Sequence, residues 1–550
     1  MEGARITTRP SPVTVAADEL PETPFSSVSY DTSADADAID SHQDQDVSSR
    51  RKRAKSAWNR LLRTETLLNE ATPRGQKTGP MIGSSPLSYV TRDSYLSLQT
   101  VWTEKHDGLV NLAVVIFVCY HLRFLLDNLL NHGLYLRVPN VVMSSLQGPG
   151  VPPALWCVPM LLGFACNAVF IEKLAAWLLE TEQQYWTEID KKDDTKAKAD
   201  FPALQQRNKW VTFIANVLNT SMQLVVPCFI VLTHDVPILL GSILTLLTII
   251  EWLKLVSYAH CNWDERVARR EGQSRVGEKG GGPLTKSGGD DPAWAVLKYP
   301  ENVTIKNMFW YLLTPTLTYQ VNFPMSPKFR PMLLLRWSIE LVVFQTLFYF
   351  MADQFLAPAM VSSIKPMREL EFMRFLERMF AMALPNVYCW LLMFYSLFHL
   401  LCNILAEITR FGDREFYKEW WNARDLGEYW KLWNIPVHRW CLRTLYYPAL
   451  RYGYSKFWAG MAAFVVSAVF HEVLPAVPLR MMRGYGFWGM VLQVPLVALT
   501  MFLRKALKTD ALGNYFLWLV FCFVGQPMMF AMYYHDWLVA HKGNAALMSH

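Results

Sequence analysis

Long apolar stretches alternate with polar connections from about residue 108 almost to the end of the chain. A helix that crosses a bilayer needs about 20 mainly apolar residues, and these stretches are long enough to do so. The pattern predicts an all-α polytopic membrane protein with about nine transmembrane helices. The predicted spans are residues 108–131, 151–178, 210–234, 236–258, 332–357, 376–409, 457–480, 484–505 and 513–538.

The first 83 residues have a different pattern, since Ser, Thr, Pro, Asp and Ala dominate and no apolar period is present. Such a segment cannot bury enough surface to offset its ordering entropy, so we expect a disordered tail. Its basic run at 50–55 favours a cytosolic N-terminus under the positive-inside rule. That run is either a solvated charge block or a tether to an anionic leaflet, and both interpretations stay open. Residues 264–296 are charged and Gly-rich, which predicts a flexible loop.

The composition agrees with a membrane protein that carries a polar tail. Hydrophobic residues make up 52% of the chain and charged residues 18%, against roughly 25% charged residues in an ordinary soluble protein. This excludes a mainly disordered protein, a disulfide scaffold and an ordinary cytosolic enzyme. The net charge of +6 is small for 550 residues, and no nucleic-acid-binding signature occurs, so no nucleic-acid partner is expected. The nine cysteines show no CxxC and no metal-ligand spacing, so no metal site is expected.

One ionisable pair, His471-Glu472, lies near the middle of the predicted span 457–480. A charged side chain at mid-bilayer costs roughly 2.5–3.5 kcal/mol, so we expect such a pair to have a structural or functional role. His471 can take and return a proton near neutral pH, and Ser467 lies on the same helical face. This pattern alone leaves three interpretations open: a structural histidine in a helix bundle, a proton-relay histidine of a transporter, or a catalytic base. Adjacent side chains point about 100° apart on a helix, so Glu472 is free to anchor the helix to a neighbour instead.

The polar connection 411–440 is rich in Trp and Tyr interleaved with charges, which is typical of the headgroup region of a membrane. It is either an aromatic anchor without chemistry or a surface that gathers an amphiphile with a charged head and an acyl tail. His438 is a rival candidate base, but it lies in this polar connection rather than within a span. Gln526 is the sole amide in the apolar run 516–534. A buried amide must find a partner, and a bound carbonyl is one option.

Three ordered signatures resemble the sterol and diacylglycerol acyltransferase branch of the membrane-bound O-acyltransferase (MBOAT) family. Residues 416–422 are similar to the family's FYxxWWN signature, residues 433–440 resemble the second signature, and residues 467–472 carry the match to the family's catalytic histidine. The matching positions of the first signature are Phe416, Tyr417, Trp420, Trp421 and Asn422. Residues 315–324 resemble the type 1 diacylglycerol acyltransferases, whereas sterol acyltransferases differ there. The resemblance covers roughly residues 105–540 and leaves out the acidic tail.

The resemblance implies the MBOAT fold, in which a cytosolic tunnel and a lateral opening to the bilayer meet at the histidine. It also implies that acyl-CoA and diacylglycerol are the substrates and that His471 is the general base on the free hydroxyl of diacylglycerol. The oxygen then attacks the thioester and CoA leaves, without a cofactor or a metal. The family pattern places Asn434 and Glu472 with His471 in the catalytic set. Around the substrates it places Trp433, Tyr446, Lys456, Ser467, Met490, Gln493 and Gln526.

The resemblance further implies an endoplasmic reticulum membrane protein that assembles as a homodimer or homotetramer through the segment before the first span. The expected organisation is a cytosolic tail at 1–83, this pre-span segment at 84–107 and a catalytic membrane domain at 108–550. Departures from the pattern occur at Val473 in place of Tyr, Glu419 in place of Asp, and Gly460 in place of a second basic residue after Lys456. None removes a reacting group. A sterol or wax-alcohol acyltransferase is the alternative within the class, and a proton-coupled transporter is the alternative outside it.

Overall fold

The structure is a computed structural model that describes residues 147–271, 297–507 and 511–546, together with residues 115, 126, 130 and 145. The predicted tail, the pre-span segment, most of the first predicted span and most of the Gly-rich loop therefore lie outside the described residues. The description below concerns one compact unit that includes residues 138–550. Within the described part of this unit, the regular elements are all helices, which confirms the predicted all-α class.

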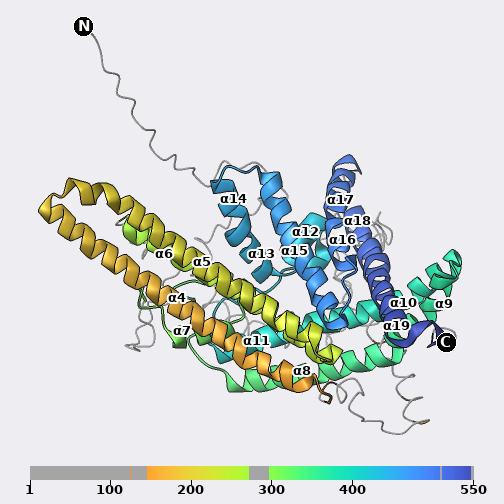
Figure 1. Ribbon diagram of the computed structural model, residues 1–550. Helices are drawn as coiled ribbons and strands as arrows, with labels where there is room; N and C mark the ends of the chain where they lie inside the picture. The colour runs from red at the N-terminus through yellow and green to blue at the C-terminus, as the bar shows by residue number, and fades with distance from the viewer. Residues whose placement is uncertain are drawn as a thin grey trace, which may run out of the picture. The chain divides into compact units, whose positions relative to one another are not determined.

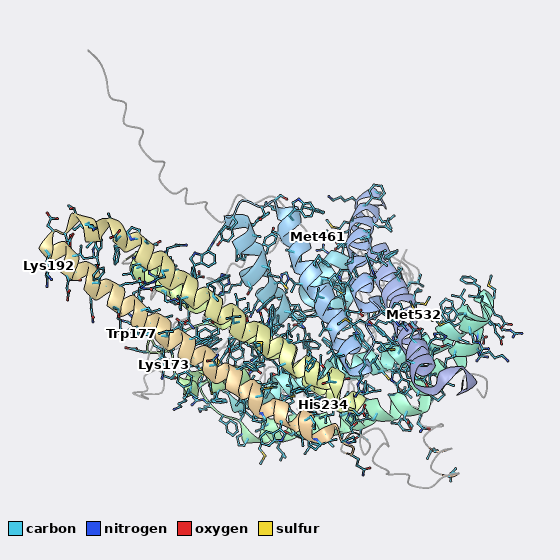
Figure 2. The ribbon with its side chains drawn as sticks, in the orientation of Figure 1. Lys173, Trp177, Lys192, His234, Met461 and Met532 are labelled. Carbon is cyan, nitrogen blue, oxygen red and sulfur yellow. The ribbon has the colours of Figure 1, made fainter. Side chains whose placement is uncertain are left out.

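The first three described helices are α4 (Val151–Lys192), α5 (Thr195–Thr233) and α6 (Ile238–Arg270), and they pack against one another. α4 and α5 run side by side as a long antiparallel hairpin (Figure 1). Lys192 marks the turn of this hairpin and His234 lies at its other end (Figure 2). With 42 residues, α4 is about 63 Å long, roughly twice the hydrocarbon thickness of a bilayer. The hairpin therefore extends beyond the membrane.

Buried ion pairs hold α6 against α4. Arg266 donates to Glu172 Oε1, which also accepts from the hydroxyl of Tyr299 at 2.8 Å. Further along the same two helices, Arg270 Nε donates to Glu182 Oε2 at 3.0 Å. Removing one partner of such a buried pair leaves an uncompensated charge, so these pairs fix how the helices align.

The middle of the unit contains the short helix α7 and two long helical segments. Each long segment is continuous through a π-helical turn, and the second one packs against the first. The elements are α7 (Ile305–Leu313), α8 (Pro331–Met351), η2 (Ala352–Leu356), α9 (Ala357–Arg368), α10 (Phe372–Phe394), η3 (Tyr395–Leu401) and α11 (Cys402–Ile408). The ammonium of Lys254 donates to the carbonyls of Tyr311 at 2.8 Å and Thr314 at 2.6 Å. This contact satisfies the orphan carbonyls at the end of α7.

The C-terminal part begins with several short helices and continues with the apolar helices that carry the site. The elements are η4 (Trp420–Asn422), α12 (Leu426–Leu432), α13 (Ile435–Cys441), η5 (Leu442–Tyr446), α14 (Tyr447–Arg451), α15 (Lys456–Leu479), α16 (Tyr485–Val491), α17 (Gln493–Leu507), α18 (Ala511–Phe516), η6 (Leu517–Gly525) and α19 (Gln526–Ala546). α15 packs against α6 and α16, and α16 also contacts α19. Helices α6 and α19 therefore both pack against the pair formed by α15 and α16.

In the part of the chain that the structure describes, seven helical segments are long and apolar enough to cross a membrane. They are Val151–Lys192, Thr195–Thr233, Ile238–Arg270, Pro331–Arg368, Phe372–Ile408, Lys456–Leu479 and Tyr485–Ala506. Each coincides with a span predicted from the sequence. The predicted span 513–538 falls on α18, η6 and α19, a helical segment that is not among the seven. The total of nine spans stays a prediction.

Two predicted spans contain features that the apolar pattern alone did not explain. α5 begins about fifteen residues before the predicted span 210–234, because its polar first part packs outside the apolar region. There, Asn208 Nδ2 donates to the buried Glu182 at 2.9 Å. In the predicted span 332–357, Arg336 and Glu340 pair with each other at 2.7 Å, one helical turn apart. Such a pair lowers the cost of charges in an apolar helix.

Candidate active site

The residues around His471 sit on α15, and the two sides of this helix differ. Ala468, Glu472 and Ala476 recur every four residues and are buried, at 0%, 9% and 0% exposure. The His471 side chain is exposed, although it lies well inside an apolar helix of 24 residues. The ring is therefore accessible to a substrate, while the opposite side of α15 is packed.

The hydrogen bonds of His471 define its tautomer. Its Nδ1 lies 2.7 Å from the backbone oxygen of Ser467, one turn earlier, and 3.4 Å from the Ser467 hydroxyl. A carbonyl oxygen only accepts, so Nδ1 carries the hydrogen and donates it. In the neutral ring the lone pair is then on Nε2, which is the nitrogen that can accept a proton. Ser467 and His471 are thus brought together, and the Ser467 carbonyl orients the imidazole.

Glu472 faces away from the exposed side of α15 and binds the corner that leads into α16. Its Oε1 accepts from the backbone N–H of Gly484 at 2.7 Å. Its Oε2 accepts from the N–H groups of Gly486 at 2.9 Å and Phe487 at 3.2 Å, and from the hydroxyl of Tyr533 at 2.8 Å. A carboxylate suits the orphan donors at the start of a helix. These contacts give Glu472 the anchoring position that the sequence left open as an alternative to a catalytic one.

α16 crosses α15 closely at His471. A Cβ added to Gly486 would lie 2.4 Å from the carbonyl oxygen of His471. Met490, one turn after Gly486, is 7% exposed. Gln493 begins α17, and its Nε2 donates to the Gly489 carbonyl at 3.4 Å. Its Oε1 is buried without a hydrogen-bond partner among the described residues, so it is an acceptor available to a bound donor.

The first signature, together with Trp433 of the second, folds into an aromatic cluster against α10. Trp433 stacks on Trp390 with ring centroids 4.6 Å apart and lies 4.5 Å from Phe394. Trp420 is 2% exposed and joins the same cluster. Tyr417 shares a hydrogen bond of 2.8 Å with His399, and Phe416 is buried nearby. These rings contact one another, so the signature acts first as a core that fixes the 411–440 connection.

The polar positions of the signatures hold turns and helix ends. Asn434 Oδ1 accepts from the N–H of Val437 at 3.2 Å, which caps α13. The amide of Asn422 donates to Glu419 Oε2 at 3.1 Å, and the exposed Trp421 accepts at its carbonyl from Asn514 at 2.9 Å.

The remaining expected substrate residues are spread over three elements. Tyr446 is buried at the end of η5, which packs on α15, and Lys456 begins α15. Gln526 begins α19, and its Oε1 accepts from Asn386 on α10 at 3.1 Å. The structure thus brings Ser467, His471 and the α16 crossing together directly, and it ties α19 to them through Glu472.

The comparisons with known proteins agree with the signatures. Residues 294–534 match the membrane-bound O-acyltransferase family. The chain is 35% identical over 460 residues to diacylglycerol O-acyltransferase 1C of Glycine max, which is 84% of this chain and 80% of that protein. It is 34% identical over 442 residues to diacylglycerol O-acyltransferase 1 of Bos taurus, which is 80% of this chain and 82% of that protein.

The chain belongs to the membrane-bound O-acyltransferase family. It is a multi-pass membrane enzyme, an O-acyltransferase, and its expected likeness to the type 1 diacylglycerol acyltransferases is confirmed. The matched region 294–534 includes every site residue predicted from the sequence, whereas α4, α5 and α6 lie before it.

In this MBOAT protein, the rival base His438 lies on α13 and is half-buried. Burial, together with the nearby cations Lys431 and Arg439, lowers the pKa of His438 to about 4. It is therefore neutral at physiological pH. Among the residues that the structure describes, no group of three or more His, Cys, Asp or Glu side chains is placed to hold a metal ion.

Sequence reasoning missed Tyr533 and the glycines at the start of α16. Gly484 has a φ of 80°, a left-handed conformation that favours glycine, and Gly486 allows the close crossing. Two glycines just before an apolar helix were the available signal. Tyr533 gave no such sequence signal, because its partner Glu472 is 61 residues away in the sequence.

Proposed function

We propose that this enzyme is a diacylglycerol O-acyltransferase, which transfers a fatty acyl group from acyl-CoA to the free hydroxyl of diacylglycerol. The products are triacylglycerol and CoA. The observation that carries the proposal is the accessible imidazole of His471, which carries its hydrogen on Nδ1 and leaves Nε2 as the base. The names of relatives at 34–36% identity support diacylglycerol as the acceptor.

The chemistry needs one residue that takes a proton and returns it. Nε2 of His471 removes the proton from the lipid hydroxyl as its oxygen attacks the thioester carbonyl. The carbon–sulfur bond then breaks, and the imidazolium returns the proton to the leaving thiolate, which yields CoA and regenerates the neutral ring. A positioned general base contributes typically 10²–10⁴-fold. Alignment of the two lipid substrates contributes much of the rest.

The other predicted residues have assigned roles in this proposal. Ser467 orients the base through its carbonyl, Asn434 belongs to the catalytic set, and Glu472 serves that set by anchoring the helix that carries the base. The substrates are held by Trp433, Tyr446, Lys456, Met490, Gln493 and Gln526. Lys456 contributes a positive charge toward the phosphates of CoA. The assignment of Gln493 is supported by its buried Oε1, which has no hydrogen-bond partner among the described residues. Acyl-CoA is a substrate, so the proposal includes no cofactor.

The proposal includes the setting of the enzyme. We place it in the endoplasmic reticulum membrane with its N-terminus in the cytosol, as a homodimer or homotetramer. The basic run at 50–55 supports the orientation. The resemblance to the type 1 acyltransferases supports the compartment and the assembly through residues 84–107.

Purified protein with labelled oleoyl-CoA and a panel of acceptors tests the function. Diacylglycerol should yield labelled triacylglycerol. Ester formed with cholesterol or a long-chain alcohol but not with diacylglycerol would move the assignment to a sterol or wax-alcohol acyltransferase. Proton-driven flux without any ester would make the protein a transporter.

Replacement of the base tests the mechanism. His471→Ala should lower turnover by about 10²–10⁴-fold while the protein keeps its thermal midpoint in detergent. His438→Gln is the matched control and should lose much less, because a pKa of about 4 makes His438 a weak base near neutral pH. Full activity in His471→Ala, or equal losses in both variants, would contradict the assignment of the base.

A further inference from the structure

The corner between α15 and α16 is held by two residues of α19. The hydroxyl of Tyr533 donates to Glu472 Oε2 at 2.8 Å and accepts from the N–H of Gly486 at 3.1 Å. Three residues further along α19, Asp536 Oδ2 accepts from Tyr485 at 3.0 Å and pairs with Arg483 at 2.9 Å. α19 therefore binds this corner at two separate points, of which only the first reaches the helix of the base.

The contacts of Tyr533 use its hydroxyl in both directions at a buried position. Tyr533 is 5% exposed, so water is largely excluded from the bond to Glu472. The hydroxyl connects the carboxylate next to His471 in sequence with the N–H of Gly486, where α16 crosses the His471 carbonyl. One hydroxyl thus ties together the two backbones that set the position of the imidazole.

The same helix carries a second residue of the proposed site. Gln526 lies seven residues before Tyr533, which is about two turns, so the two side chains are on the same face of α19. Gln526 accepts from Asn386 of α10, and Tyr533 donates to Glu472 of α15. The placement of α19 between α10 and α15 therefore depends on both polar contacts.

We propose that Tyr533 is a positioning residue for acyl transfer, which fixes the backbone that carries His471 through Glu472 and Gly486. This inference rests on the proposed function, since it assigns a role in the reaction for which His471 is the base. Tyr533 contacts neither the imidazole nor the proposed substrate residues, so its loss acts on the alignment of the base. Alignment errors of about 1 Å can lower rates by about 10²-fold.

A pair of tyrosine variants tests the proposal with a matched control. Tyr533→Phe keeps the ring and removes the hydroxyl from Glu472 and Gly486. Tyr485→Phe, whose ring lies 5.2 Å from that of Tyr533, removes a hydroxyl from the same corner without touching Glu472. We expect Tyr533→Phe to lower kcat by about 10–100-fold, with KM for both substrates within about 2-fold. Tyr485→Phe should change kcat by less than about 3-fold.

A double-variant cycle identifies the route of the effect. In a Glu472→Gln background, Tyr533→Phe should lower kcat much less than it does in the unaltered enzyme, because the two residues act as one unit. Three outcomes would each overturn the proposal. They are equal kcat losses in Tyr533→Phe and Tyr485→Phe, an unchanged kcat in Tyr533→Phe, and full additivity of Tyr533→Phe with Glu472→Gln. All values are taken per folded protein, as judged by the thermal midpoint and a monodisperse elution profile.

The failure of this inference is distinct from the failure of the proposed function. The unaltered enzyme on the acceptor panel and His471→Ala test the function, and neither involves α19. If the acceptor is a sterol instead, the same tyrosine comparison is made with that acceptor. If His471→Ala keeps full activity, the base assignment fails even where Tyr533→Phe is impaired.

Discussion

A single methyl group at the crossing of α15 and α16 should disable this enzyme. In Gly486→Ala, the new Cβ would lie 2.4 Å from the carbonyl oxygen of His471, 2.9 Å from its carbonyl carbon and 3.2 Å from the Cα of Glu472. All three are backbone atoms, so no side-chain rotation relieves the clash. The methyl group therefore forces the two helices apart at the base.

The magnitude follows from the contact distances. Ordinary van der Waals contact begins at 3.4 Å, so a contact of 2.4 Å requires a shift of about 1 Å between α15 and α16. That shift also stretches the bonds that Glu472 accepts from Gly484 and Gly486, now 2.7 and 2.9 Å. A misplacement of about 1 Å at a reacting group can lower the rate by about 10²-fold. We expect kcat to fall by about 10²-fold.

The assay is acyl transfer to diacylglycerol by purified protein, with Gly489→Ala as the control. Gly489 lies on the same helix, and its added Cβ would meet the sulfur of Met529 at 3.0 Å, the end of a flexible side chain that can move. Both changes gain helix propensity of about 1 kcal/mol, so that effect cancels in the comparison. Gly489→Ala should keep its activity within about 2-fold. Equal activity in the two variants would refute the close crossing as a determinant of the base.

Two further predictions concern His438 in the polar connection 411–440 and Glu407 at the end of the helix before it. His438 has its pKa lowered from 6.5 to about 4, so the unfolded chain binds more protons and stability falls as pH drops from about 6.5 to about 4, by at most about 3 kcal/mol. His438→Gln should therefore lose less thermal stability than the unaltered protein between pH 7 and pH 4.5, and an identical loss would contradict the shift. Glu407 is 1% exposed and pairs with Arg330 at 2.9 Å and Arg414 at 2.6 Å. Glu407→Gln should lower the free energy of unfolding by about 2–3 kcal/mol, against less than about 1 kcal/mol for Glu415→Gln, a half-exposed control that also pairs with cations, as measured by thermal midpoints.

Local sequence patterns predicted the helices because burial in a bilayer imposes a long apolar run on each span. The same rule could not predict where α5 begins, since its first fifteen residues are polar. Asp194 caps their first turn by accepting from the N–H groups of Lys196 and Ala197. Glu182 of α4 then binds both Asn208 of this polar part and Arg270 of α6. These contacts join segments 26 and 88 residues apart in the sequence, and no local period encodes them. Tertiary contacts thus set the length of the hairpin.

In the candidate site, too, the sequence predicts the local contacts and does not predict the distant ones. Ser467 and His471 are one turn apart, so their proximity follows from helix geometry, and the hydrogen bond between them lies within one helix. The role of the first signature did not follow from its composition, because aromatic residues suit both a membrane interface and a core. Trp420 of this signature and Trp433 of the second one pack on Trp390 of α10, about 30 and 43 residues away. Only the folded chain shows that this signature is mainly internal.

The arrangement of α15 explains why an exposed imidazole can still be held in place. An exposed side chain has few packing contacts of its own, so its position depends on the backbone below it. Gly486 on the facing helix brings α16 into direct contact with that backbone. Glu472 then locks the contact with four hydrogen bonds. One side of α15 is thus committed to packing, which leaves the side with His471 open, as the proposed acyl transfer requires.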